Sequence, residues 1–151
     1  MIDGVEIKNL KMIPDERGTL MEILRSDDHL FEKFGQVYVT TVYPGVVKAW
    51  HGHKLQTDFF TVVSGMIKMV LCDLRESSSS NGEIFEMFIG QDNPALIRIP
   101  PGVFHGIKCI GTGLAIALNV PTEPYNHANP DEERLPWNTD QIKYDWDINL
   151  S

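Results

Sequence analysis

Short hydrophobic runs recur along the chain from Val5 to Val120, and Gly, Pro, Asn, Asp or Ser residues separate them. The runs are rich in Val, Ile, Phe and Thr, and several alternate between apolar and polar positions. Many short segments of this kind, with turn residues between them, are typical of an antiparallel sandwich or barrel. The pattern predicts an all-β fold with strands in residues 5–13, 19–25, 36–43, 46–53, 57–64, 66–74, 83–90, 95–100, 103–110 and 113–120.

One segment has a helical pattern instead. In residues 28–34, Asp27 or Asp28 could cap the first turn and Gly35 could end the last one. We therefore predict a short helix near residues 28–34, placed between two of the strands.

The sequence changes character after Val120. Residues 121–151 are rich in Pro and acidic side chains but also carry Trp137, Tyr144 and Trp146. These aromatic residues predict an irregular tail that packs on the barrel or on a partner subunit. A chain of 151 residues with 42% hydrophobic content can close one core. We expect a single domain, residues 1–151, with its core in residues 5–120.

The charge and the apolar content exclude several classes of partner. Asp and Glu total 21 against 13 Lys and Arg, and the net charge of −8 argues against nucleic acid or an anionic membrane as a partner. No apolar run approaches the roughly 18 residues of a membrane span, and the N-terminus lacks a signal-peptide pattern, so we expect a cytoplasmic protein. Cys72 and Cys109 lie in apolar surroundings without metal or redox spacing, which predicts two buried free thiols.

Four side chains of the metal-ligand type occur in two segments. His51 and His53 are two residues apart in an expected strand and therefore point to the same face. Asp58 begins the next strand after a short turn, and His105 follows the Pro-Pro-Gly turn at residues 100–102. These four residues could converge on a divalent metal, or they could form a polar barrel mouth without one.

The same segments resemble the two cupin motifs. Residues 45–65 match the first motif, with Asp58 in place of its usual Glu. Residues 94–110 match the second, with Pro94 and Ile110 in place of its opening Gly and closing Asn. The resemblance implies a cupin-type antiparallel β-barrel, also called a jelly roll.

A narrower resemblance extends over nearly the whole chain, to the dTDP-4-dehydrorhamnose 3,5-epimerase family. Its elements occur in the family's order and approximate spacing. They are Asp15–Gly18 with Glu22, Phe34–Gln36, Gly45–His51, Asp73–Arg75, Ile99–Gly106, Pro121–Tyr125, and Trp137–Asn138 with Trp146.

This resemblance implies an isomerase that acts on a deoxythymidine-diphospho-4-keto-6-deoxyhexose, as a homodimer and without a required metal or other cofactor. The reaction needs a base to remove a proton next to the ketone and a group to stabilise the enolate. It also needs an acid to return a proton to the other face.

The resemblance also implies roles for single residues. His51 falls on the catalytic base, and Arg17, Gln36, Lys48 and His105 fall on positions that contact the substrate. Strict strand alternation puts Lys48 on the face opposite His51 unless the strand carries a bulge.

Other positions depart from the family. Asp58 stands where the family has an enolate-stabilising Lys, and Tyr125 lies one residue away from the position of the acid Tyr. We include both as candidate catalytic residues, and His53 as a substrate contact because it shares a strand face with His51.

Two alternatives to the epimerase remain open. A metal held by His51, His53, Asp58 and His105 would make the protein a metal-dependent cupin enzyme acting on another keto sugar or carbonyl compound, and His51 could then not be a free base. A nucleotide-sugar-binding cupin without catalysis is the other alternative. The acidic run Asp131–Glu133 is expected to be a solvated surface.

Overall fold

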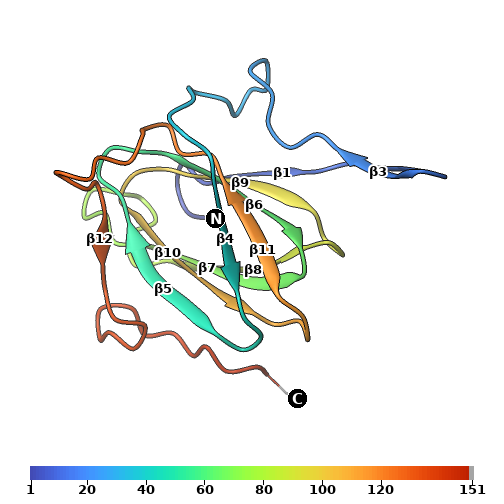
Figure 1. The fold of residues 1–151 in the computed structure, drawn as a ribbon. Helices are drawn as coiled ribbons and strands as arrows, with labels where there is room; N and C mark the ends of the chain where they lie inside the picture. Colours follow the sequence, from blue (N-terminus) through green and yellow to red (C-terminus); the bar gives the residue numbers. More distant parts are fainter. Residues whose placement is uncertain (150–151) are drawn as a thin grey trace.

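The computed structural model describes residues 1–149 and consists of two antiparallel sheets that face each other, with a separate two-stranded hairpin (Figure 1). The strands of the described part are β1 (Glu6–Asn9), β2 (Met12–Asp15), β3 (Gly18–Met21), β4 (Tyr38–Val42), β5 (Val47–Gly52), β6 (Asp58–Ser64), β7 (Met66–Asp73), β8 (Ile84–Gly90), β9 (Ala95–Ile99), β10 (Val103–Cys109), β11 (Ala115–Asn119) and β12 (Glu133–Arg134). The last two positions of the predicted tail lie outside this range.

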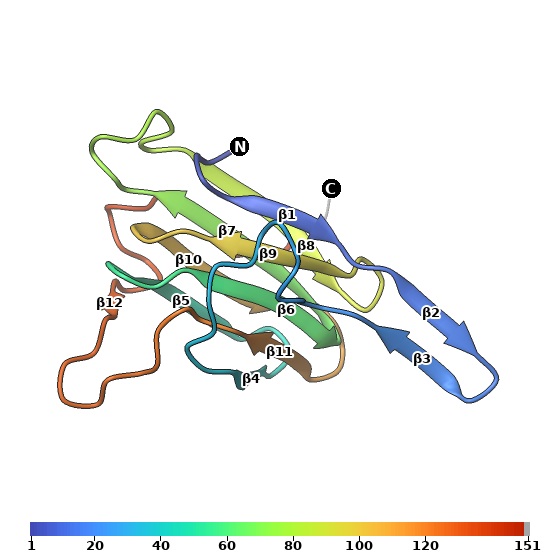
Figure 2. The ribbon, with the colours of Figure 1, turned by 90° about the horizontal axis from the view of Figure 1, so that it is seen from above.

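The strands pair in the manner of a jelly roll. One sheet has the order β1-β9-β6-β11-β4, and the other has the order β12-β5-β10-β7-β8. The hairpin β2-β3 stands away from both sheets (Figure 2). The all-β prediction and the cupin-type fold are therefore confirmed, and each predicted hydrophobic run overlaps at least one strand.

The predicted helix at residues 28–34 is wrong, because the described residues contain no helix. The Asp28 carboxylate accepts hydrogen bonds from Lys8 Nζ at 2.6 Å and from the Arg25 N–H at 2.9 Å, so it closes a turn and does not cap a helix. The Gly35 N–H donates to the Pro121 carbonyl at 3.0 Å. Polar groups of this segment thus form hydrogen bonds with residues that are distant in sequence. The segment is therefore an irregular connection and not a helix. None of the described residues forms a helix that could cross a membrane.

The apolar core lies between the two sheets and follows the alternation of each strand. In β7, for example, Ile67, Met69 and Leu71 are fully buried in this core. Cys72 and Cys109 are buried and free, as the sequence predicts.

The outer face of the sheet that contains β5 is covered by the C-terminal tail. Ile142 and Trp146 pack with Trp50 of β5 and with Phe104 of β10, and the Trp50 and Trp146 ring centroids are 5.0 Å apart. The Trp50 N–H donates to the Leu135 carbonyl at 2.9 Å, so the tail also continues the hydrogen bonding of β5.

Strand β5 carries a β-bulge against β10. His51 is paired with His105, but Lys48 is paired with Ile107, so two residues of β5 oppose Gly106 alone. A Cβ atom at Gly106 would lie 2.4 Å from Cβ of Ala49 and 3.0 Å from the Trp146 ring, which only glycine avoids. The bulge changes which face of the strand Lys48 occupies relative to His51.

Candidate active site

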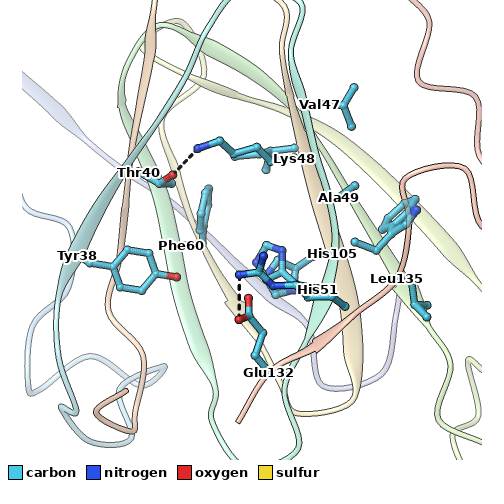
Figure 3. Close-up of a pocket in the computed structure, with 13 residues that line it drawn as sticks. Tyr38, Thr40, Val47, Lys48, Ala49, His51, Phe60, His105, Glu132 and Leu135 are labelled. Atoms are coloured by element: carbon cyan, nitrogen blue, oxygen red, sulfur yellow. Dashed lines mark hydrogen bonds and ion pairs between the residues drawn. The ribbon is translucent and has the colours of Figure 1, made fainter. Parts of the chain in front are cut away.

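A pocket of about 530 Å³ opens between β4 of one sheet and β5 of the other (Figure 3). Its size suits a small-molecule ligand. The side chains around it are a mixture of aromatic, aliphatic and charged groups. They are Tyr38, Thr40, Val47, Lys48, Ala49, Trp50, His51, Phe60, His105, Ile107, Glu132, Arg134 and Leu135.

Three imidazole rings lie together at this pocket: His51 and His105 line it, and His53 lies beside them outside the lining. His51 and His105 are directly paired across β5 and β10, and their ring centroids are 4.0 Å apart. The His53 ring lies 5.9 Å from that of His51 and 6.0 Å from that of His105. One nitrogen from each ring lies within 4.8 Å of the others, so the three rings could share one cation.

The Pro-Pro-Gly turn holds His105 in this arrangement. Gly102 has a φ of +81°, and a Cβ atom there would lie 2.6 Å from Cγ of Arg75, so the turn requires glycine. The Gly102 N–H donates to the His53 carbonyl at 2.7 Å. The sequence motif is therefore a link between the turn before β10 and the end of β5.

Asp58 begins β6 and lies behind the imidazoles, with 1% of its surface exposed. Its Oδ1 accepts a hydrogen bond from Gln56 Nε2 at 2.8 Å. Its Oδ2 lies 3.4 Å from Nε2 of His53 and 3.5 Å from Nε2 of His105. None of these three facing atoms has a hydrogen-bond partner among the described residues.

The other ring nitrogens explain why this cluster is unusual. Nδ1 of His53 contacts the Asp131 carbonyl, and Nδ1 of His105 lies 3.4 Å from the Val103 carbonyl. Carbonyl oxygens only accept, so each Nδ1 carries a proton and, in neutral rings, each Nε2 presents a lone pair. Two lone pairs and a carboxylate oxygen then meet without a donor, which favours a cation between them, either an added proton or a metal ion.

Burial keeps two of the rings neutral. It lowers the pKa of His105 to about 3, and the neighbouring His53 acts in the same direction. Burial, reinforced by His105, also lowers the pKa of His51 well below its ordinary value. His51 is therefore a neutral imidazole at pH 7, which is the form that can accept a proton.

The bulge places Lys48 in the pocket wall with His51. Its Nζ donates to Thr40 Oγ1 at 3.1 Å and to the Thr41 carbonyl at 2.7 Å. Figure 3 shows the ammonium group reaching across the pocket from β5 to β4.

Like His53 and Asp58, three further predicted site residues lie outside the pocket lining. Gln36 Oε1 accepts a hydrogen bond from the Tyr125 N–H at 3.1 Å, and the Tyr125 side chain is 45% exposed and packs against His127. Arg17 lies at the turn of the β2-β3 hairpin, where it pairs with Asp15.

The expectation that residues 131–133 form only a solvated surface is wrong. The Asp131 carboxylate accepts hydrogen bonds from the N–H groups of Lys54 at 2.9 Å, Leu55 at 2.9 Å and Gln56 at 3.0 Å. Burial alone would raise the pKa of the Asp131 carboxyl, but these three donors outweigh it and lower the pKa. Asp131 thus fixes the loop between His53 and Asp58.

Three ionisable pocket residues were not singled out from the sequence. Glu132 and Arg134 enter the site because β12 pairs with β5, with Arg134 opposite His51, and Arg134 donates to Glu132 at 3.0 Å. Tyr38 enters it from β4. The alternation of Tyr38 with Thr40 could have indicated a shared face, but no local signal showed that this face meets His51.

The comparisons with known proteins agree with this geometry. The chain matches the dTDP-4-dehydrorhamnose 3,5-epimerase family over residues 1–151. It is 42% identical over 146 residues to the spore coat polysaccharide biosynthesis protein SpsL of Bacillus subtilis, covering 97% of each chain. It is 40% identical over 151 residues to the probable low-salt glycan biosynthesis epimerase Agl13 of Haloferax volcanii, covering 99% of this chain and 97% of that protein.

Solved structures have the same fold. A dTDP sugar isomerase from Desulfovibrio desulfuricans superposes with a TM-score of 0.91 at 36% identity, covering 96% of this chain and 92% of that one. A dTDP-6-deoxy-D-glucose-3,5-epimerase from Legionella pneumophila, solved with dTDP-4-keto-L-rhamnose, superposes with a TM-score of 0.85. It covers 99% of this chain and 81% of that one at 22% identity, a likeness of fold alone.

Replacement of Asp131 tests its role in holding the site. Asp131→Ala should lower the free energy of unfolding by about 2 kcal/mol, because three backbone donors lose a charged acceptor. Denaturant unfolding measures this change, and NMR should show a shifted His53 ring. The matched control Glu133→Ala, which loses only an exposed ion pair with Lys54, should stay within about 0.5 kcal/mol of the parent protein. Equal losses of unfolding free energy in the two variants would contradict the role of Asp131 in fixing the loop between His53 and Asp58.

Proposed function

This chain belongs to the dTDP-4-dehydrorhamnose 3,5-epimerase family and is an isomerase, and we propose that it epimerises a dTDP-linked 4-keto-6-deoxy sugar. The observation that carries the proposal is the position of His51, paired with His105 in the wall of a pocket of suitable size. The solved dTDP sugar isomerase at 36% identity supports the nucleotide. The two relatives that are at least 40% identical are named for polysaccharide or glycan synthesis, which supports a role in supplying a sugar for such a polymer.

His51 is the general base in this proposal. The neutral imidazole accepts the proton on the carbon next to the ketone, and the electron pair of that C–H bond forms the enolate. The enolate also needs a donor in place of the Lys that the family carries where this chain has Asp58. In this proposal the donor is a proton held by Asp58, His53 and His105, whose three facing atoms lack a hydrogen-bond partner among the described residues.

Two cations suit the diphosphate of the substrate. Lys48 and Arg134 both line the pocket, whereas the chain as a whole carries a net charge of −8. Two positive side chains close together can bind an anionic ligand even though the net charge of the chain is negative. Gln36 and Tyr125 border the same end of β4, where they could contact the rest of the nucleotide sugar.

Proton exchange with solvent tests the proposed base. A dTDP-linked 4-keto-6-deoxyhexose incubated with the protein in deuterium oxide should gain deuterium at C3, at C5, or at both. His51→Ala should slow this exchange by about 10² to 10⁴, and NMR of the sugar measures it. The rate should be constant around pH 7 and fall only at a pH well below the ordinary histidine pKa of 6.5, because the pKa of His51 is lowered and its protonated form is inactive.

The control for this experiment is His29→Ala, which removes an exposed imidazole outside the pocket. It should leave the exchange unchanged. A parent protein that binds the nucleotide sugar and exchanges no deuterium would instead support a binding module without catalysis.

A second candidate function follows from the unpaired atoms of the histidine cluster. The rings of His51, His53 and His105 offer nitrogen atoms close enough to share a divalent metal. Asp58 faces two of these rings, and its Oδ2 and their Nε2 atoms have no hydrogen-bond partner among the described residues. Such an ion would polarise the ketone oxygen of a substrate. His51 could then not act as a free base, and the protein would be a metal-dependent cupin enzyme on a keto sugar or another carbonyl compound.

Metal analysis separates the two candidates. The epimerase proposal predicts well under one divalent ion per subunit by elemental analysis and no change in melting temperature with a chelator. A metal enzyme would hold about one ion per subunit and lose stability on chelation. In that case Asp58→Ala would remove most of the metal, whereas the control Asp92→Ala, at an exposed position, would not.

We also propose a homodimer, because it reconciles the position of Arg17 with a role in substrate binding. The β2-β3 hairpin projects from the body of the protein (Figure 2) and exposes Met12, Ile13 and Leu20, with 41%, 46% and 57% of their surfaces accessible. Arg17 at its turn could therefore reach the pocket of a second copy. The cytoplasmic location and the absence of a nucleic-acid partner stay predictions from the sequence.

Mutation of the hairpin tests the dimer. The parent protein should have the mass of a dimer by light scattering at micromolar concentration, and Leu20→Asp should give a monomer because it places a charge in the interface. Arg17→Ala should keep the dimer mass but raise KM. The control Leu114→Asp, at an exposed site on another loop, should remain dimeric. A monomeric parent protein would overturn the proposal.

A further inference from the structure

We propose that Tyr38 is the acid that returns a proton to the substrate on the face opposite His51. The inference rests on the proposed epimerase function and adds a residue that the family resemblance does not supply. The resemblance points to Tyr125 for this role, whereas the geometry points to Tyr38 in β4.

Tyr38 and His51 lie in opposite walls of the pocket. Tyr38 is the first residue of β4, at the edge of one sheet, and His51 lies in β5 of the facing sheet. Figure 3 shows the Tyr38 hydroxyl turned into the pocket toward the histidines, across the space between them. A flat enolate bound in this space would present one face to His51 and the other to Tyr38.

A buried amide positions the phenol. Asn119 is 1% exposed and is paired with Tyr38 across β11 and β4. Its Nδ2 donates to the Tyr38 hydroxyl oxygen at 2.9 Å. Because that oxygen accepts from the amide, the phenol's own proton is directed away from Asn119 and is available on the pocket side.

The protonation state of Tyr38 suits an acid. Burial raises the pKa of its phenol above the ordinary value, although the hydrogen bond from Asn119 acts in the opposite direction. The phenol is therefore protonated at neutral pH. The same hydrogen bond would stabilise the phenolate that forms when the proton is given up.

Tyr125 lies outside the pocket. Its side chain is 45% exposed, against 37% for Tyr38, but unlike Tyr38 it packs against His127 and is absent from the pocket lining. The Tyr125 backbone N–H donates a hydrogen bond to Gln36 Oε1, and Gln36 is also outside the pocket lining. A donor for a buried enolate has to reach the reacting carbon, which favours Tyr38 over Tyr125.

The proposed step balances without a co-reactant. His51 takes the proton from one face of the carbon next to the ketone, and the enolate forms. The enolate carbon then takes the proton of the Tyr38 O–H bond from the other face, and the electron pair of that bond stays on the phenolate oxygen. The ketone forms again with the carbon inverted, and exchange with water restores neutral His51 and protonated Tyr38.

The test separates removal of the proton from its return. A dTDP-linked 4-keto-6-deoxyhexose in deuterium oxide is followed by NMR, which records both deuterium incorporation and inversion. Tyr38→Phe should keep exchange within a few-fold of the parent protein, because His51 can return deuterium to the face it deprotonated. Inversion should fall by about 10² to 10⁴, the usual contribution of an acid.

The matched control is Tyr43→Phe, in a side chain that is 71% exposed and outside the pocket lining. It should invert the substrate at nearly the parent rate. An unchanged affinity of Tyr38→Phe for dTDP would show that the variant retains its pocket.

Two results would overturn the inference in distinguishable ways. If the parent protein inverts the sugar and Tyr38→Phe does so at the same rate, Tyr38 is not the acid, and the epimerase function stands. If the parent protein neither exchanges nor inverts, the proposed function fails and takes this assignment with it.

Discussion

The backbone pairing of β5 with β10 sets the geometry on which the site depends. Two residues of β5 lie opposite Gly106, and the close approach of Ala49 and the Trp146 ring leaves no room for a Cβ atom there. The resulting bulge places Lys48 and His51 in the same pocket wall, while His51 stays paired with His105. A regular strand would have pointed Lys48 away from the base.

The pocket is completed by segments that are distant in sequence. The tail that packs on β5 brings Arg134 opposite His51 and lets Asp131 fix the loop before Asp58. The other wall comes from β4, which supplies Tyr38. The site is thus built at the junction of two sheets, where groups from facing strands can address both faces of a flat intermediate.

The sequence predicted the fold because hydrophobic alternation and turn residues are local signals. It also predicted the meeting of His51, His53, Asp58 and His105, because these residues lie in short motifs with defined strand geometry. The helix prediction failed because long-range partners, such as Lys8 on Asp28, are not visible in a local pattern.

Tyr38, Asp131 and Arg134 escaped prediction for the same reason, since each acts through strand pairing or loop contacts across the fold.

The protonation state of His51 tests the proposed chemistry most directly, and NMR of nitrogen-labelled imidazole rings at pH 7 measures it. A neutral His51 is predicted, because burial and His105 lower its pKa. A protonated or metal-bound His51 at pH 7 would contradict its role as the base.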